Sequence, residues 1–156
     1  MEIVINFNDM NWSAIGPELI ILTTAFLILL AGLKKSLNTL SFLSNISLIG
    51  VVAAFLFTLS LWSGAPTAES GNSSGIFSGS LIHDRFSLAF NLIFLLMSVF
   101  AIFGSARYPQ ENHENKAEYF TLLLMAVAGM MFMAKSGNLI TIFISLELFS
   151  IALYIL

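Results

Sequence analysis

Five apolar runs separated by short polar connections dominate this sequence. A transmembrane helix needs about 20 mostly apolar residues, and each run is close to that length. Only 10% of the residues are charged and 58% are hydrophobic, with a mean hydropathy of +0.92, whereas soluble domains carry about 25% charged residues. The sequence therefore predicts an all-α integral membrane protein with about five transmembrane helices in a single membrane domain, residues 1–156. The predicted spans are 17–33, 40–62, 86–105, 118–134 and 139–156.

The charge balance and the absence of cysteine exclude several kinds of site. The formal net charge of -3 is too small to indicate a nucleic-acid partner. Without cysteine the chain cannot form a disulfide, a Cys-ligated zinc site or a Cys-ligated iron–sulfur cluster. Glu111, His113 and Glu114 share a short polar connection that lacks the inward-pointing geometry of a metal site. We therefore expect no cofactor and no metal in this chain.

The start of the chain does not look like a cleaved signal. The first 12 residues contain two acidic residues and no Lys or Arg, whereas a secretory signal begins with basic residues. The first apolar run is therefore expected to be a retained span. Glu18 follows Pro17 at its start, and we interpret Glu18 as a helix-start carboxylate. The alternative is a charge near the membrane surface that touches a partner.

Residues 63–83 form the longest polar connection and are rich in Gly and Ser, so they are predicted to be an exposed loop. Asp84 and Arg85 follow this loop and are interpreted as a solvated pair at the membrane interface. His83 titrates near neutral pH in its free form, but a lone histidine beside a loop is more often a bystander than a proton relay. Both interpretations of His83 stay open.

The turn at residues 135–138 is too short to join anything but two antiparallel helices. The fourth and fifth spans must therefore be neighbours. Ala126 and Gly129 lie three residues apart on one face of the fourth span, which permits close approach of a second helix.

The distribution of Lys and Arg over the short connections predicts the orientation in the membrane. The basic residues of one set of connections are Lys34, Lys35, Arg107 and Lys116, and those of the other set are Arg85 and Lys135. Because cytoplasmic connections carry the excess of basic residues, the first set is expected in the cytoplasm and the N-terminus outside.

Glu147 is the one carboxylate in the interior of the fifth span. It lies roughly 12 Å into that span, where an acidic residue costs about 2.5 to 3.5 kcal/mol. Ser150 and Tyr154 share its helix face, which is expected to point to a protein interior. A cation that moved toward and away from this carboxylate would make it release and take up a proton. The interpretation is proton or ion handling, with a structural carboxylic acid as the alternative.

The partner that this carboxylate needs is not obvious in the sequence. Lys135 lies twelve residues before Glu147, roughly 18 Å along the helix axis. A cation must therefore come from elsewhere. The chain also stops at Leu156 without the polar or aromatic flank of the earlier spans, which suggests the front part of a longer protein.

Residues 118–134 (EYFTLLLMAVAGMMFMA) and 137–154 (GNLITIFISLELFSIALY) are similar to the fourth and fifth helices of the antiporter-like subunits of proton-pumping NADH:quinone oxidoreductase, respiratory complex I. Pro17-Glu18 and Asp84 fit the same pattern, and Leu146, where sister subunits tend to have Trp, favours the subunit N type. The resemblance implies the first part of a bundle of about fourteen helices. It also implies that Glu147 pairs with a lysine of a broken seventh helix.

The resemblance further implies a subunit that translocates protons while other subunits bind NADH, FMN, iron–sulfur clusters and quinone. Its partners would be the other membrane subunits, and its location the inner (plasma) membrane of a bacterium. Two alternatives remain open. One is a subunit of a multi-subunit sodium/proton antiporter complex, and the other is a passive membrane scaffold or a truncated fragment without function.

Overall fold

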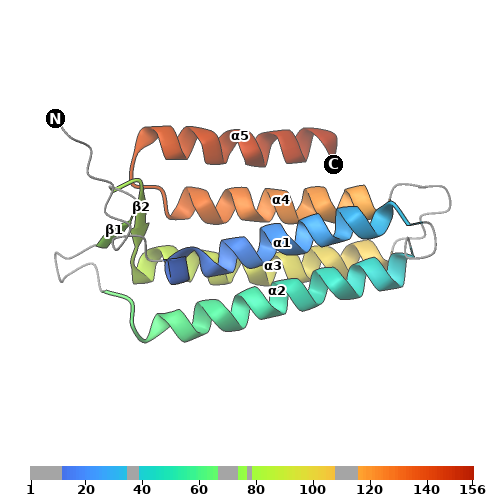
Figure 1. Cartoon of the computed structure of the whole chain (residues 1–156), viewed down its shortest axis with the longest axis horizontal. Helices are drawn as coiled ribbons and strands as arrows, with labels where there is room; N and C mark the ends of the chain where they lie inside the picture. The colour runs from blue at the N-terminus through green and yellow to red at the C-terminus, as the bar shows by residue number, and fades with distance from the viewer. Residues whose placement is uncertain (1–11, 35–38, 67–73, 77–78, 108–115) are drawn as a thin grey trace.

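The computed structural model describes residues 12–34, 39–66, 74–76, 79–107 and 116–156, and these form five α-helices with a small β-hairpin at one end of the bundle (Figure 1). A 3-10 helix, η2 (Trp12–Ile15), leads directly into the first α-helix. The α-helices are α1 (Gly16–Gly32), α2 (Leu40–Trp62), α3 (Arg85–Arg107), α4 (Lys116–Ala134) and α5 (Leu139–Ile155). The hairpin consists of β1 (Ser74–Ile76) and β2 (Leu81–His83).

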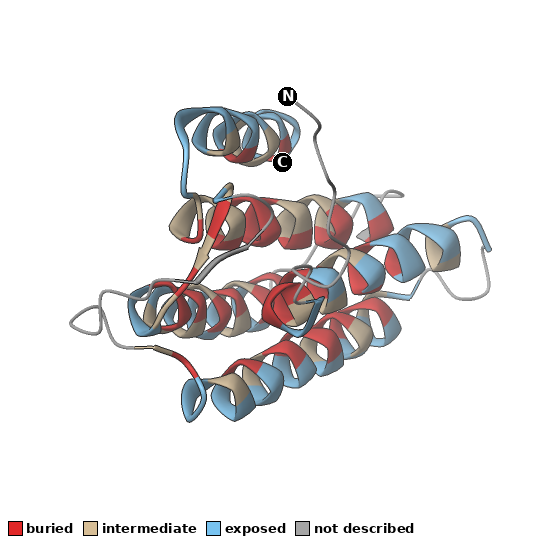
Figure 2. Ribbon diagram, turned by 60° about the vertical axis from the view of Figure 1, so that its left-hand side comes forward, coloured by how far each residue is buried: buried red, intermediate tan, exposed pale blue. Residues whose placement is uncertain are grey.

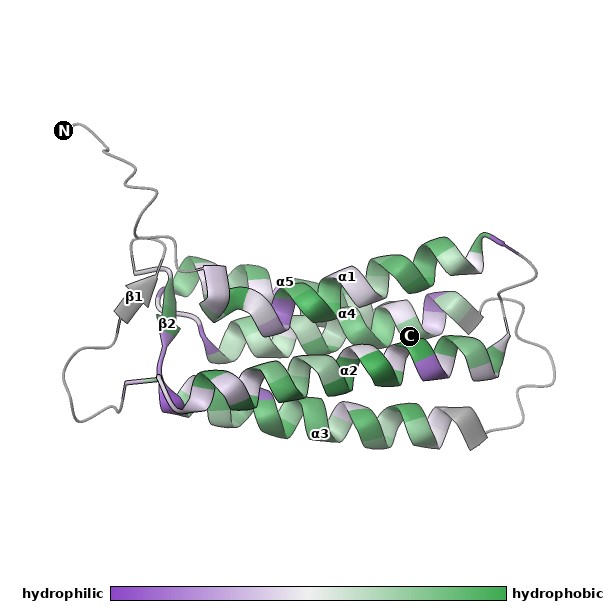
Figure 3. Cartoon of the chain, turned by 60° about the horizontal axis from the view of Figure 1, so that its bottom comes forward, coloured by the Kyte–Doolittle hydropathy of each residue, from purple (hydrophilic) through white to green (hydrophobic). Residues whose placement is uncertain are grey.

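The expectation of an all-α membrane protein is confirmed. Within the described ranges, four segments are long and apolar enough to cross a membrane, and α5 is a shorter apolar helix of 17 residues, about 26 Å long. Apolar residues extend along the length of the helices (Figure 3). The helices begin and end within two residues of the predicted spans. Hydropathy locates them well because a backbone in lipid must satisfy its hydrogen bonds within each helix.

Local sequence signals set the helix starts. Pro17 lies in the first turn of α1, where its missing N–H would have had no partner. Asn138 caps α5, because its side-chain oxygen accepts hydrogen bonds from the Thr141 backbone N–H at 2.8 Å and from the Thr141 hydroxyl at 2.7 Å. The cap starts α5 immediately after the turn from α4.

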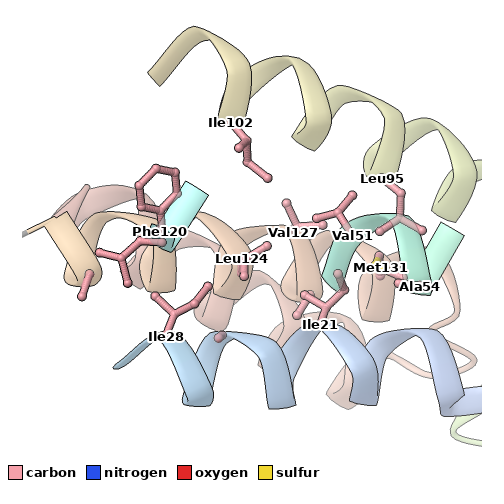
Figure 4. Close-up of a cluster of buried hydrophobic side chains, with 14 residues drawn as sticks. Ile21, Ile28, Val51, Ala54, Leu95, Ile102, Phe120, Leu124, Val127 and Met131 are labelled. Atoms are coloured by element: carbon pink, nitrogen blue, oxygen red, sulfur yellow. The ribbon is translucent and has the colours of Figure 1, made fainter. Parts of the chain in front are cut away.

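The apolar core lies between α1, α2, α3 and α4, whose side chains point toward one another (Figure 4). Helix α4 packs against α1, α3 and α5, while α2 packs against α1 and α3. Phe120 and Met131 of α4, Ile21 of α1 and Leu95 of α3 are fully buried. In contrast, large apolar side chains such as Phe100 are exposed on the outside of the bundle, as a lipid-facing surface requires.

In the described part of residues 63–83, the hairpin corrects the prediction of an exposed loop. Strands β1 and β2 pair antiparallel, with Gly75 opposite Ile82, and Gly79 in the turn has a φ of 82° that favours glycine. Leu81 and His83 are buried. Composition suggested exposure because Gly and Ser dominate the segment, but strand β2 packs its side chains against the end of the helical bundle.

Helix α5 packs closely against α4 along one face. Only Ser145 and Ala152 of α5 are buried, and Figure 2 shows the rest of this helix largely exposed. Gly129 allows this contact, because a Cβ at this position would lie 2.9 Å from the backbone nitrogen of Phe149. The predicted close approach at Ala126 and Gly129 is present, with both residues buried in α4.

The substitution Gly129→Ala should separate α4 from α5. The added Cβ meets backbone atoms that cannot rotate away, so we expect a loss of about 1 to 3 kcal/mol in stability. Gly104→Ala in α3 is the matched control, because a Cβ added at Gly104 would have no neighbouring atom within 4 Å. The melting temperatures of both variants in detergent check this prediction, and equal melting temperatures would contradict it.

Candidate functional site

Glu147 lies on the face of α5 that points away from the other helices. Its side chain is exposed in the described part of the chain, and it lies about 200° around the helix from the buried Ser145. Ser150 is half-buried and Tyr154 is 91% exposed. Helices α1–α4 do not cover this face, because α5 packs against α4 with its opposite face. The face of Glu147 was expected to point to a protein interior, and α1–α4 do not provide one.

No hydrogen bond or ion pair joins Glu147 to another described residue. A carboxylate at this depth without a partner is costly in a bilayer. The structure therefore leaves Glu147, Ser150 and Tyr154 on an open face, and the cation expected near Glu147 is not supplied by the described helices.

A second carboxylate has the buried ion pair that Glu147 lacks. The Glu18 Oε1 atom lies 2.7 Å from Lys135 Nζ, and the two side chains are 0% and 2% exposed. Asn91 Nδ2 donates to the same Glu18 oxygen at 2.7 Å, and Lys135 Nζ also donates to the Ala14 carbonyl at 2.6 Å. Glu18 stands in the first turn of α1, as the interpretation of a helix-start carboxylate requires. That turn faces the inside of the bundle, so the sequence did not predict the buried ion pair.

Four segments meet at this ion pair. Lys135 directly follows α4, Glu18 begins α1, Asn91 lies two turns into α3 and Ala14 belongs to η2. Strand β2 fixes the backbone beside Lys135, because Ile82 N–H donates to the Lys135 carbonyl at 2.7 Å. Gly137 N–H donates to the Ser80 carbonyl at 2.8 Å, which ties the turn between α4 and α5 to the hairpin.

His83 is the last residue of β2 and is 7% exposed. Burial lowers the pKa of His83 below its usual value, and the positive charge of Lys135 lowers it further. The negative charges of Glu18 and Asp84 oppose this effect. Burial also lowers the pKa of Lys135, whereas the negative charge of Glu18 and the hydrogen bond between the two side chains raise it. Burial, with a smaller contribution from Lys135 52 positions away in sequence, thus favours the neutral form of His83 by lowering its pKa.

Asp84 and Arg85 do not form the predicted solvated pair. Asp84 Oδ1 accepts from the Ser87 backbone N–H at 2.8 Å, so Asp84 caps the start of α3. Arg85 Nε instead donates to the Ala65 carbonyl at 3.3 Å. The two side chains therefore stabilise the ends of separate segments.

One sequence signal could have revealed the Glu18–Lys135 pair. Alternating spans put the start of the first helix and the end of the fourth at the same membrane face, so these charges were available to each other. The sequence does not say which helices are neighbours, and that knowledge decides the pairing.

Among the described residues no group of three His, Cys, Asp or Glu side chains could hold a metal ion. Glu111, His113 and Glu114 lie outside the described residues.

The chain is similar to known proteins over nearly its whole length, although no protein-family profile matches it. It is 33% identical to NADH-quinone oxidoreductase subunit N of Trichlorobacter lovleyi over 96% of the chain, and 36% identical to NADH-quinone oxidoreductase subunit N 1 of Koribacter versatilis over 90%. It is also 34% identical to F(420)H(2) dehydrogenase subunit N of Methanosarcina mazei over 91%. The chain covers 29%, 28% and 29% of these relatives' own lengths.

The substitution Lys135→Met should destabilise the protein because it leaves the Glu18 carboxylate buried without its cation. We expect a loss of about 3 to 5 kcal/mol, whereas replacing both partners in Glu18→Gln/Lys135→Met should cost much less. Lys34→Met is the control, because Lys34 is exposed. Thermal unfolding of the three variants in detergent measures the effect. A single variant as stable as the double variant would refute the importance of the pair.

Proposed function

The chain belongs to the subunit N family of NADH-quinone oxidoreductases, and we propose that it is a proton-translocating membrane subunit of such a complex. In this proposal it couples the transfer of electrons from NADH to quinone in other subunits to proton transport across the membrane. The whole complex is the translocase, and this chain carries out no redox chemistry itself.

The observation that carries this proposal is the position of Glu147. This carboxylate sits in the middle of an apolar helix, on a face that α1–α4 leave uncovered. Lipid offers no hydrogen bond to a carboxylate, so a protein surface must cover this face. A helix that brings a cation to Glu147 would favour the ionised carboxylate, and withdrawal of the cation would favour the protonated one. Alternation between these arrangements moves one proton. Ser150 lies on the same side and is proposed to hold water or accept a hydrogen bond near Glu147.

The names of the relatives support a subunit that does not bind the electron donor. Relatives of similar identity are named for NADH, for NAD(P)H and for F(420)H(2). A chain that contacted the donor would have to distinguish these molecules. The proposed cofactors NADH, FMN, iron–sulfur clusters and quinone therefore belong to other subunits, and the proposed partners are the neighbouring membrane subunits.

The multi-pass architecture is proposed to lie in the inner (plasma) membrane of a bacterium, with the N-terminus outside. In this orientation the hairpin and the Glu18–Lys135 pair lie at the outer face, and α5 runs inward from Asn138. The single membrane domain is proposed to be the first part of the antiporter-like bundle.

The substitution Glu147→Gln in the full-length protein should reduce proton pumping severalfold, because an amide cannot take up and release the proton. Glu118→Gln is the matched control, since Glu118 is exposed in the first turn of α4. The measurement is the acidification of inverted membrane vesicles per NADH oxidised, with the amount of assembled complex determined in parallel.

Each alternative function predicts another result. Unchanged pumping by an assembled complex would refute the role of Glu147 and favour a passive scaffold. Transport that required sodium but not NADH would favour the sodium/proton antiporter complex.

A further inference from the structure

Strand β2 and the turn from α4 to α5 lie side by side at one end of the bundle (Figure 1). The Ile82 N–H donates to the Lys135 carbonyl at 2.7 Å, and the Gly137 N–H donates to the Ser80 carbonyl at 2.8 Å. The two bonds connect the segments in opposite chain directions, so the turn pairs antiparallel with β2 and the residue before it. Two elements that are far apart in the sequence therefore share one small set of backbone hydrogen bonds.

The pairing includes the residues between and after these two bonds. Leu81 and Ser136 form an antiparallel bridge. Asn138 Nδ2 donates to the Ser80 hydroxyl at 3.2 Å, while Asn138 Oδ1 accepts from the Thr141 backbone N–H and caps α5. Each residue of the turn is thus bound to the hairpin segment, and the last one also starts the next helix.

Gly137 makes this pairing close. A Cβ at this position would collide with the carbonyl oxygen of Gly79 and would lie 3.2 Å from the Ile82 side chain. The carbonyl oxygen belongs to the backbone, which cannot rotate away as a flexible side chain does. Any larger residue at position 137 must therefore move the turn away from the hairpin.

The start of α5 has a strong influence on where Glu147 lies. The main helical neighbour of α5 is α4, and Ser145 and Ala152 are its only buried residues in the described structure. Glu147 follows Asn138 by nine residues, which is roughly 14 Å along the helix axis. A shift or tilt at the first turn of α5 is therefore carried along the helix to the carboxylate.

We propose that Gly137 and the hairpin segment 80–82 are positioning residues for Glu147. Their pairing fixes the start of α5, stays closed during transport and holds the carboxylate where a group outside α1–α4 can meet it. This inference rests on the proposed function of Glu147 in proton transport. Alignment is critical for such a step, because a misplacement of about 1 Å can slow a reaction about 100-fold.

The substitution Gly137→Ala in the full-length protein tests the proposal. The added Cβ should push the turn away from Gly79 and displace the start of α5, and with it Glu147. We expect the number of protons moved per NADH oxidised to fall at least about threefold, because proton transfer depends on this alignment. Inverted membrane vesicles measure the ratio, and a cryo-EM map of the assembled complex gives the position of Glu147.

Gly64→Ala is the matched control, because a Cβ added at Gly64 would have no neighbouring atom within 4 Å. It should change neither the proton ratio nor the position of Glu147. Normal pumping by an assembled Gly137→Ala complex overturns the proposal, and so does reduced pumping with Glu147 in its original place. A role in folding alone would lower the amount of assembled complex and leave the proton ratio of that complex unchanged.

A disulfide across the pairing tests whether it stays closed during transport. Paired residues of antiparallel strands have Cα atoms about 4.5 to 5.5 Å apart, and a disulfide spans about 4.4 to 6.8 Å. Leu81→Cys/Ser136→Cys replaces the bridged pair in a chain without cysteine. We expect the oxidised variant to pump as well as the reduced one and the two single-cysteine variants. Inhibition by oxidation that a reductant reverses would overturn the proposal, because the pairing would then have to open.

Ser80→Ala decides the question if Gly137→Ala does not assemble. It removes only the hydroxyl that accepts from Asn138 Nδ2, so it should lower the proton ratio by a smaller factor, and an unchanged ratio would then overturn the proposal. The result for Glu147→Gln is separate. Normal pumping by Glu147→Gln refutes the proposed function, whereas reduced pumping by Glu147→Gln with normal pumping by Gly137→Ala refutes only the positioning role.

Discussion

The ion pair between Glu18 and Lys135 determines how one end of the bundle is put together. It joins the start of α1 to the end of α4, and the same two side chains bind Asn91 of α3 and Ala14 of η2. Two charges removed from water gain little net stability from each other, but either one alone is strongly unfavourable. The pair therefore disfavours arrangements that separate α1 from α4, because these leave a charge buried without a partner.

Two of the glutamates in the helices, Glu18 and Glu147, illustrate opposite solutions to the same problem. Glu18 has a cation, an amide donor and full burial, and its neighbours belong to the chain itself. Glu147 has none of these among the described residues and faces outward. The first carboxylate is fixed by its surroundings, whereas the second lies on a face that α1–α4 leave uncovered.

Hydropathy alone located the helices, because each apolar run in a membrane has to form all its backbone hydrogen bonds within one helix. The α4–α5 hairpin and the close contact at Gly129 also followed from sequence, since both depend on neighbouring residues. The Glu18–Lys135 pair did not, because it joins groups that are 117 positions apart. The β-hairpin was missed for a related reason. Its second strand is held partly by Lys135 and Gly137 rather than by a long strand pattern of its own.

The separation of Glu18 and Lys135 along the chain has a consequence for biosynthesis. A ribosome adds about 5 to 20 residues per second, so Lys135 is made roughly 6 to 23 seconds after Glu18. During that interval α1, α2 and α3 emerge while the Glu18 carboxylate has no ammonium group to meet. The final arrangement of the first three helices is therefore completed only when α4 joins them, and the last-made partner of the pair closes the bundle.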